Sequence, residues 1–234
     1  MKFRKYLFIL INVIIVLLVL TSYKESRKFV DPLDERFIPG EVKNMEEMTV
    51  DLAYESILSP NSVKEVENAV KAMPADVIKS FVREGWKISV TQSIRIPEKE
   101  QLLYEQGAIA GLCDFDRKVI QIKIIDEANE DITGSYYIRT IHELSHYADY
   151  VYGNISESDG FQRLFKQHQK DYIEYEYAGM ERDQSTALQM DYATSNAGEF
   201  FACGLKDYLA NSDYLRENYV NMYVFFRNMI DKGV

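Results

Sequence analysis

The spacing of apolar residues changes twice along this chain, and this change restricts the fold more than any other feature of the sequence. Helical spacing extends through residues 46–58, 62–73 and 74–84. Residues 86–91 then alternate apolar and polar side chains as a half-buried strand does, and residues 118–125 place three isoleucines on one face. Helical spacing returns at Tyr136 and continues almost to the end of the chain.

The middle segment is predicted to form a β-hairpin. Asp114-Phe115-Asp116-Arg117 favours a turn between short strands at 108–113 and 118–125. The later helices are predicted over residues 136–151, 158–177, 197–209 and 213–231. This order of elements predicts an α+β domain that is mostly helical, with its helices packed mainly on one side of a small antiparallel or mixed sheet.

The first 22 residues have the pattern of an export leader. A basic opening, which includes Lys2, Arg4 and Lys5, precedes an apolar run from Leu7 to Leu20. The run is shorter than the roughly 18 to 20 residues of a comfortable spanning helix, which favours a cleaved signal peptide, but no A-x-A-like cleavage site follows it. Residues 1–22 are therefore predicted to be either a signal peptide or an N-terminal membrane anchor.

The rest of the chain is predicted to be an exposed tether at 23–44, which carries two prolines and a glycine, and one domain at 45–234. We expect the domain to be secreted or anchored on the outer face of the cell membrane.

The chain is strongly acidic. When the three basic residues of the leader are left out, it contains 24 basic and 37 acidic residues, and this net charge of −13 excludes a nucleic-acid partner. Cys113 and Cys203 form no disulfide framework; they are either one bridge or two small buried apolar side chains.

The predicted helix at 136–151 contains the pattern H-E-x-x-H. His142 and His146 lie one turn apart on the same helix face, so both imidazoles can reach one metal ion. Zn²⁺ prefers tetrahedral nitrogen and oxygen ligands, and a hydrolytic site keeps one position for water, so one further protein ligand is required. Glu143 is predicted to be the general base. The alternative is a pair of surface histidines, against which Ile138 and Ile141 place the motif near the buried side.

Glu199 is predicted to be the third ligand. It is a single carboxylate among small and apolar residues at the start of a helix, where an unpaired buried charge needs compensation. The alternative is a glutamate that only stabilises the helix N-terminus. His168, the one other histidine, lies in a polar run and is expected to be exposed, and Tyr152 stands where a metzincin would need its third histidine.

Tyr192, seven residues before Glu199, is a candidate donor of a hydrogen bond to the oxyanion that forms as water attacks a carbonyl. Because the chain contains 17 tyrosines, a merely packed Tyr192 is the alternative.

These residues resemble a known family. The H-E-x-x-H helix, Tyr192 and Glu199 within Gly198-Glu199-Phe200-Phe201-Ala202 are similar to lethal-factor-like zinc metallopeptidases, namely the catalytic domain of anthrax lethal factor and the secreted Pro-Pro endopeptidases. A looser likeness covers residues 73–234. The resemblance implies a zincin-like metallopeptidase domain that binds one Zn²⁺ through His142, His146 and Glu199, with Glu143 as base and Tyr192 as oxyanion donor.

The resemblance also implies that Gly111, Leu112 and Cys113 line the cleft, where an extended protein or peptide substrate adds as a strand. Gly198 stands where the Pro-Pro endopeptidases carry a second acidic residue, and the loop at 97–106 lacks a tryptophan, so cleavage between prolines is not carried over to this chain.

The sequence therefore predicts an exported zinc endopeptidase that acts on extracellular proteins or peptides. Two alternatives remain at this point, a toxin-like protease acting on a host protein and a surface-anchored binding module whose metal is structural.

Overall fold

The computed structural model describes residues 38–43, 48–96, 109–124, 136–181, 187 and 190–232. The predicted leader, most of the predicted tether and the loop at 97–106 lie outside these residues. The strands are β1 (Ile38–Lys43), β2 (Thr49–Tyr54), β3 (Lys87–Thr91), β4 (Gly111–Asp114) and β5 (Val119–Lys123). The helices are α2 (Pro60–Ala72), α3 (Ala75–Arg83), α5 (Tyr136–Val151), α6 (Asp159–His168), α8 (Ala197–Asn218) and α9 (Val220–Lys232), with 3-10 turns η2 (Ile155–Glu157) and η3 (Tyr175–Tyr177).

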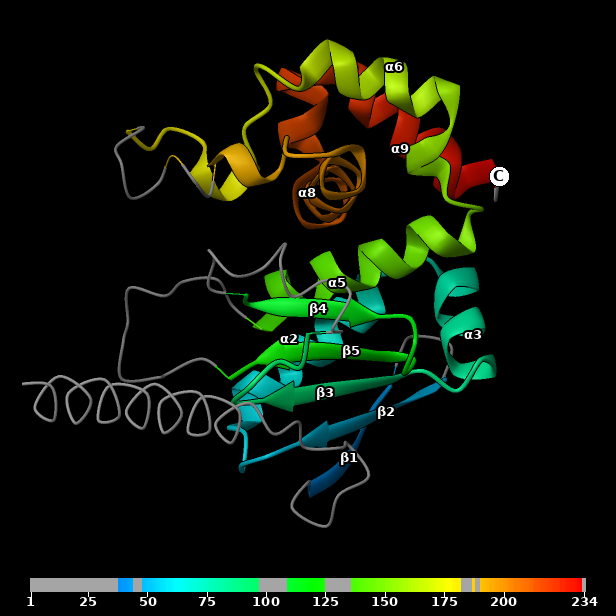
Figure 1. Cartoon of the computed structure of the whole chain (residues 1–234), viewed down its shortest axis with the longest axis vertical. Coiled ribbons are helices and arrows are strands. Elements are labelled where there is room, and N and C mark those ends of the chain that lie inside the picture. The colour runs from blue at the N-terminus through cyan, green and yellow to red at the C-terminus, as the bar shows by residue number, and fades with distance from the viewer. Residues whose placement is uncertain are drawn as a thin grey trace, which may run out of the picture.

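The five strands form one mixed sheet in the order β1-β2-β3-β5-β4. β2, β3 and β5 run parallel to one another, whereas β1 and β4 are antiparallel to their neighbours. The predicted hairpin at 108–125 is confirmed as β4 and β5. β4 lies at one edge of the sheet, next to α5 (Figure 1).

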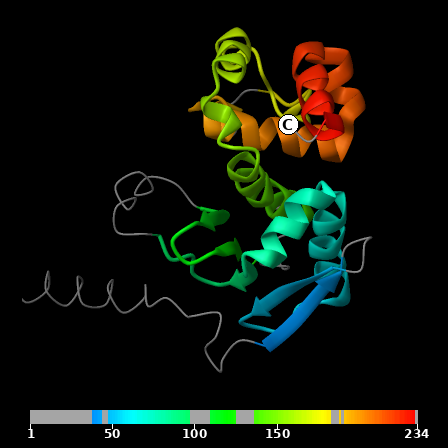
Figure 2. The same cartoon turned by 90° about the vertical axis from the view of Figure 1, so that its right-hand side faces the viewer.

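The core lies between the sheet and the helices that cover one of its faces (Figure 2). Ile88 and Val90 of β3 are completely buried, as are Ile120 and Ile122 of β5. Full burial of each such side chain stabilises the fold by about 1.5–3 kcal/mol. The inner strands thus anchor the sheet against which α5 packs, and they fix the position of that helix.

The prediction of a helix over 46–58 is wrong, because residues 49–54 form β2. Val50 and Leu52 point into the core at the two-residue period of a strand, and β2 pairs with strands on both sides. The following helix is capped by Ser59, whose hydroxyl accepts from the backbone N–H of Ser62 at 3.1 Å. The helix therefore begins at Pro60, two residues before the predicted segment at 62–73.

The predicted tether at 23–44 also needs correction, because residues 38–43 form β1, an edge strand antiparallel to β2. Pro39 is tolerated there because an edge strand has one unpaired side. The predicted helix over 158–177 is shorter than expected. α6 ends at His168, and the chain reaches η3 without a helix.

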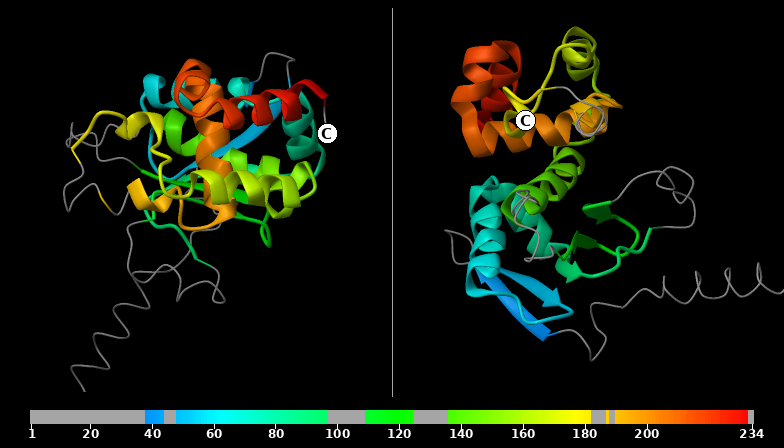
Figure 3. Two further views of the ribbon diagram at one scale, coloured as in Figure 1. Left: turned by 90° about the horizontal axis from the view of Figure 1, so that it is seen from above. Right: turned by 90° about the vertical axis from the view of Figure 1, so that its left-hand side faces the viewer.

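A second group of helices, α6, α8 and α9, packs on the opposite side of α5 from the sheet, and the views in Figures 1 and 3 agree on this arrangement. α8 continues beyond the predicted end at 209, with a kink at Asn211, and α9 follows after Tyr219. Gly204 brings α8 close to α9, since a Cβ there would lie 2.9 Å from the Met222 side chain. In the part of the chain described here, no helix has the length and hydropathy to cross a bilayer.

Candidate metal centre

α5 presents two imidazoles toward α8. His142 and His146 have their Nε2 atoms 3.2 Å apart, with ring centroids separated by 4.9 Å. Ile141 and Leu144 of the same helix are completely buried, and their packing fixes the position of the helix that carries the two rings. The predicted helix at 136–151 has the observed bounds of α5, and the histidine pair lies on its partly buried side.

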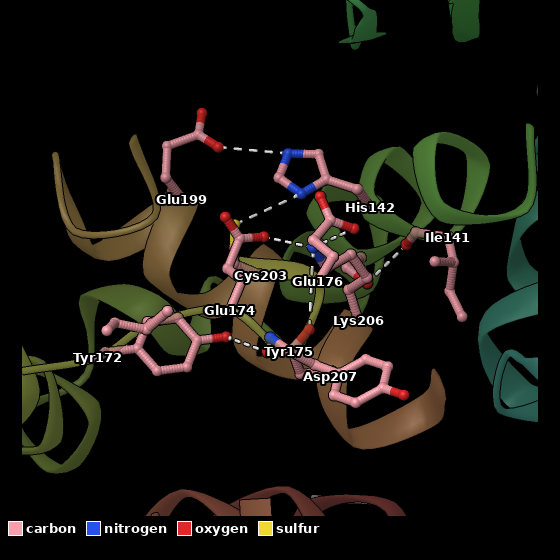
Figure 4. A network of polar contacts seen from close by, with 12 residues as sticks. Ile141, His142, Tyr172, Glu174, Tyr175, Glu176, Glu199, Cys203, Lys206 and Asp207 are labelled. Atoms are coloured by element: carbon pink, nitrogen blue, oxygen red, sulfur yellow. Dashed lines mark hydrogen bonds and ion pairs between the residues drawn. The ribbon is translucent and has the colours of Figure 1, made fainter. Parts of the chain in front are cut away.

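The first turn of α8 brings Glu199 to the same point. The Asn196 side chain caps this helix and accepts from the backbone N–H of Glu199 at 3.0 Å. Oε2 of Glu199 lies 3.3 Å from Nε2 of His142 and 3.4 Å from Nε2 of His146 (Figure 4). The structure therefore brings together the three residues that the sequence predicted as ligands.

The dimensions of this triangle suit a zinc ion. Bonds of about 2.0–2.1 Å at tetrahedral angles would set the ligand atoms about 3.3 Å apart, which agrees with the observed edges of 3.2–3.4 Å. Oε2 of Glu199 is buried and makes no hydrogen bond of its own, although it lies close to both rings. A buried carboxylate oxygen with that geometry fits a metal ligand. Among the described residues, this is the group whose histidine and carboxylate atoms converge closely enough to hold a metal ion.

The charges within the triangle also favour a cation. Burial alone would raise the pKa of Glu199, but the neighbouring His146 and His142 lower it well below its usual range. Burial alone would lower the pKa of His146, but the Glu199 carboxylate raises it to about 9. The site therefore holds positive charge next to Glu199, and a bound divalent cation would take the place of the imidazolium proton.

The centre is open on one side. The side chains of His142, His146 and Glu199 remain 13%, 21% and 14% exposed, and none of the other residues described by the structure adds a fourth ligand to the group. His168 is not involved. It is buried, with Nδ1 3.3 Å from Asp171 Oδ1, and its ring packs on Tyr219, so the expectation of an exposed side chain was wrong.

Glu143 points from α5 toward the edge strand β4. Its side chain is 94% buried, and a Cβ on Gly111 would lie 2.7 Å from Cγ and 2.8 Å from Cδ of Glu143. Burial raises the pKa of Glu143, the imidazoles of His142 and His146 act in the opposite direction, and a hydrogen bond from the Cys113 backbone N–H also lowers it. A buried carboxylate beside two imidazoles has the setting of a general base.

Among the described strands β4 pairs only with β5, so one side of its backbone has no strand partner. The N–H of Lys123 donates to the carbonyl of Ala110, so in this antiparallel register Leu112 also exchanges hydrogen bonds with β5. The N–H and C=O groups of Gly111 and Cys113 therefore face away from β5, and the N–H of Cys113 donates to Glu143. Of the three residues expected to line a cleft, Gly111 and Cys113 thus turn backbone groups outward from the sheet, while the Leu112 side chain is buried.

Tyr192 lies beside the metal centre, with its ring centroid 6.2 Å from that of His142 and the side chain 45% exposed. Partial burial raises the pKa of Tyr192, and the carboxylates of Glu199 and Glu143 raise it further. The phenol therefore keeps its proton and remains a hydrogen-bond donor.

Sequence reasoning missed one group at the centre. Cys203 was expected either to form a bridge or to be a small buried apolar side chain; it is buried and free, and its Sγ also lies 3.7 Å from Nδ1 of His142, a contact that was not predicted. The available signal was spacing, because Cys203 follows Glu199 by four residues and shares its helix face.

Gly111→Ala tests the contact between β4 and Glu143. The added methyl group is expected to displace the Glu143 carboxylate, because no room exists between them. A displacement of about 1 Å in a reacting group lowers a catalysed rate by about 10²-fold. Gly160→Ala is the matched control, since a Cβ at Gly160 meets open space and should leave the rate unchanged. Peptide hydrolysis and zinc content are measured for both variants; an unaltered rate in Gly111→Ala would contradict the close packing.

No family model matches the chain, and no curated protein matches it. A search of solved structures found a Pro-Pro endopeptidase from Paenibacillus alvei with 21% identity and a TM-score of 0.51, covering 76% of this chain and 94% of that one. This similarity shows the fold and confirms the predicted α+β class. It supports the part of the family resemblance that concerns the Pro-Pro endopeptidases and does not extend to the lethal-factor family.

Proposed function

We propose that this chain is a zinc-dependent endopeptidase. The observation that carries the proposal is the triangle formed by His142, His146 and Glu199, which has the size of one face of a tetrahedral zinc site and, within the described part of the chain, has no fourth protein ligand. Structural zinc sites are closed by four protein ligands, whereas hydrolytic ones leave a position for water. The open site thus favours hydrolysis over a surface-anchored binding module with a structural metal.

The side chains around the triangle have the roles that peptide hydrolysis needs. His142, His146 and Glu199 would hold a zinc ion, which would supply Lewis acidity to the scissile carbonyl and to a water molecule. Glu143 takes the proton from the attacking water and returns it to the leaving amine. Tyr192 keeps its phenol proton and donates a hydrogen bond to the oxyanion.

The substrate is proposed to be an extended segment of an extracellular protein or peptide. The side of β4 that faces away from β5 offers the backbone groups of Gly111 and the carbonyl of Cys113, with which such a segment can pair as an added strand. A peptide bond within a helix has its backbone N–H and C=O groups already paired, so it cannot add to β4 as a strand. Loops and unfolded termini are therefore the expected targets. We further propose that the domain works outside the cytoplasm, either secreted or held at the outer face of the membrane by its leader.

A peptide-library digestion tests the proposed function. The zinc-loaded protein is incubated with the library before and after removal of the metal by a chelator, and products are identified by mass spectrometry. Cleavage is expected only with zinc, and it should return when zinc is added back. The library includes peptides with consecutive prolines, because the solved neighbour is called a Pro-Pro endopeptidase. Cleavage that persists without metal, or no cleavage of any peptide, would overturn the proposal.

Tyr192→Phe removes only the phenol oxygen. Loss of one oxyanion donor is expected to lower kcat by about 10²–10³-fold, with little change in KM, because the hydrogen bond forms in the transition state. Tyr223→Phe on α9 is the matched control and should leave both constants unchanged. A rise in KM at constant kcat in Tyr192→Phe would instead mean that the phenol only binds substrate.

A further inference from the structure

We propose that Cys203 is a positioning residue for His142, and that its thiol connects the Nδ1 atom of that imidazole to the buried carboxylate of Glu174. The inference rests on the proposed metal centre and deepens it. It assigns a role to a thiol and to a buried ionic cluster that the proposed reaction does not use.

Each ring nitrogen of His142 has a partner on α8. Its Nε2 faces Glu199 at 3.3 Å, so Nδ1 is the nitrogen left to bind a second partner. The atom found there is Sγ of Cys203, at 3.7 Å, within hydrogen-bonding distance for sulfur. An imidazole that binds a metal through Nε2 carries its proton on Nδ1, and in most metal sites that proton is donated to a carboxylate or a carbonyl. In this chain the acceptor is a thiol sulfur.

A group of buried charged side chains lies next to Cys203 (Figure 4). Lys206 and Glu174 form an ion pair in which both residues are at least 95% buried. Lys206 Nζ also lies 3.8 Å from Asp207 Oδ1, and Asp207 accepts at 2.8 Å both from the Tyr172 hydroxyl and from the backbone N–H of Tyr175. These contacts hold the Glu174 carboxylate in one place.

The Cys203 thiol lies between His142 and the Glu174 carboxylate, with which it makes a side-chain hydrogen bond (Figure 4). A thiol in this place can donate its S–H to Glu174 while its sulfur accepts the Nδ1–H of His142. The donors and acceptors therefore run in one direction, from His142 through Cys203 to Glu174.

Two residues of α8 therefore contact the two ring nitrogens of His142. Glu199 and Cys203 are one turn apart on α8, and they contact Nε2 and Nδ1 respectively. This arrangement fixes both the tilt of the ring and its tautomer. A simple apolar filling role for Cys203 would leave the Nδ1 proton of His142 without an acceptor in a partly buried position, which is unfavourable.

The zinc affinity of matched variants tests the inference. Wild type, Cys203→Ala, Cys203→Ser and Ser212→Ala are each titrated with Zn²⁺ in competition with a chelating dye. Loss of a partner that orients a metal ligand weakens binding by about 10–100-fold, and this is the expected result for Cys203→Ala. Cys203→Ser keeps a donor and an acceptor and should lie between Cys203→Ala and wild type. Ser212→Ala, an equally small replacement further along α8, should bind zinc as wild type does.

A second measurement separates positioning from simple packing. In the zinc-loaded wild type, the Nδ1 proton of His142 should give a slowly exchanging signal in nitrogen-correlated NMR spectra, and Cys203→Ala should lose that signal or exchange it rapidly. Unaltered zinc affinity and an unaltered Nδ1 signal in Cys203→Ala would overturn the inference, as would a lower melting temperature with wild-type zinc affinity. Failure of the wild type itself to bind zinc would overturn the metal centre as a whole, a result distinct from the other two.

Discussion

The Glu143→Ala protein is expected to keep its zinc and to hydrolyse peptides about 10²–10⁴-fold more slowly than wild type, which is the usual contribution of a positioned general base. Glu143 is buried against Gly111, beside the two imidazoles, and it does not belong to the triangle of ligand atoms. Its removal therefore deletes the proton acceptor and leaves the ligands intact. Steady-state rates and zinc content are measured on the same preparation.

Glu143→Gln provides the isosteric comparison, because it keeps the shape of the side chain and removes its basicity. Both variants should lose activity to a similar degree. Hydrolysis at the wild-type rate by either variant would assign the base role to another group, and loss of zinc from both would mean that Glu143 supports the metal rather than the water.

Glu199→Ala is expected to weaken zinc binding more than 100-fold, beyond the range of about 10–100-fold that follows the loss of a partner that only orients a ligand. Glu199 supplies one of three converging ligand atoms, and its carboxylate is the anionic member of the set. Two neutral imidazoles bind the cation less tightly without it. Equilibrium dialysis against a chelator of known affinity measures the change, and peptide hydrolysis should disappear with the metal.

Glu217→Ala is the matched control for Glu199→Ala, since Glu217 is an exposed glutamate on the same helix. It should retain both zinc affinity and activity. Retention of metal and activity by Glu199→Ala would remove this residue from the ligand set and would favour the alternative in which it only stabilises the N-terminus of α8.

The helix that carries the histidines was predictable because its signal is local. Residues 136–151 repeat apolar side chains at helical spacing, and two histidines four residues apart necessarily share a face. Glu199 was predictable from a different argument, the instability of an unpaired carboxylate among apolar residues. The structure brings its oxygen to the pair, across more than fifty residues of chain.

The errors arose where pairing with distant strands decides the structure. Residues 49–54 form β2 because β1 and β3 provide partners on both sides, a nonlocal effect that outweighs the apparent helical spacing. Contacts between distant parts of the chain also determine the site. The contact of Glu143 with Gly111 and that of Cys203 with His142 join elements far apart in sequence, and neither follows from residue spacing alone.

An X-ray structure of the zinc-loaded protein, with anomalous data recorded at the zinc edge, shows directly whether the three ligands bind one ion. One anomalous peak is expected about 2.0–2.1 Å from Nε2 of both His142 and His146 and about 2.0–2.2 Å from a carboxylate oxygen of Glu199. A peak at another place in the molecule, or a Glu199 side chain turned away from the ion, would contradict this expectation.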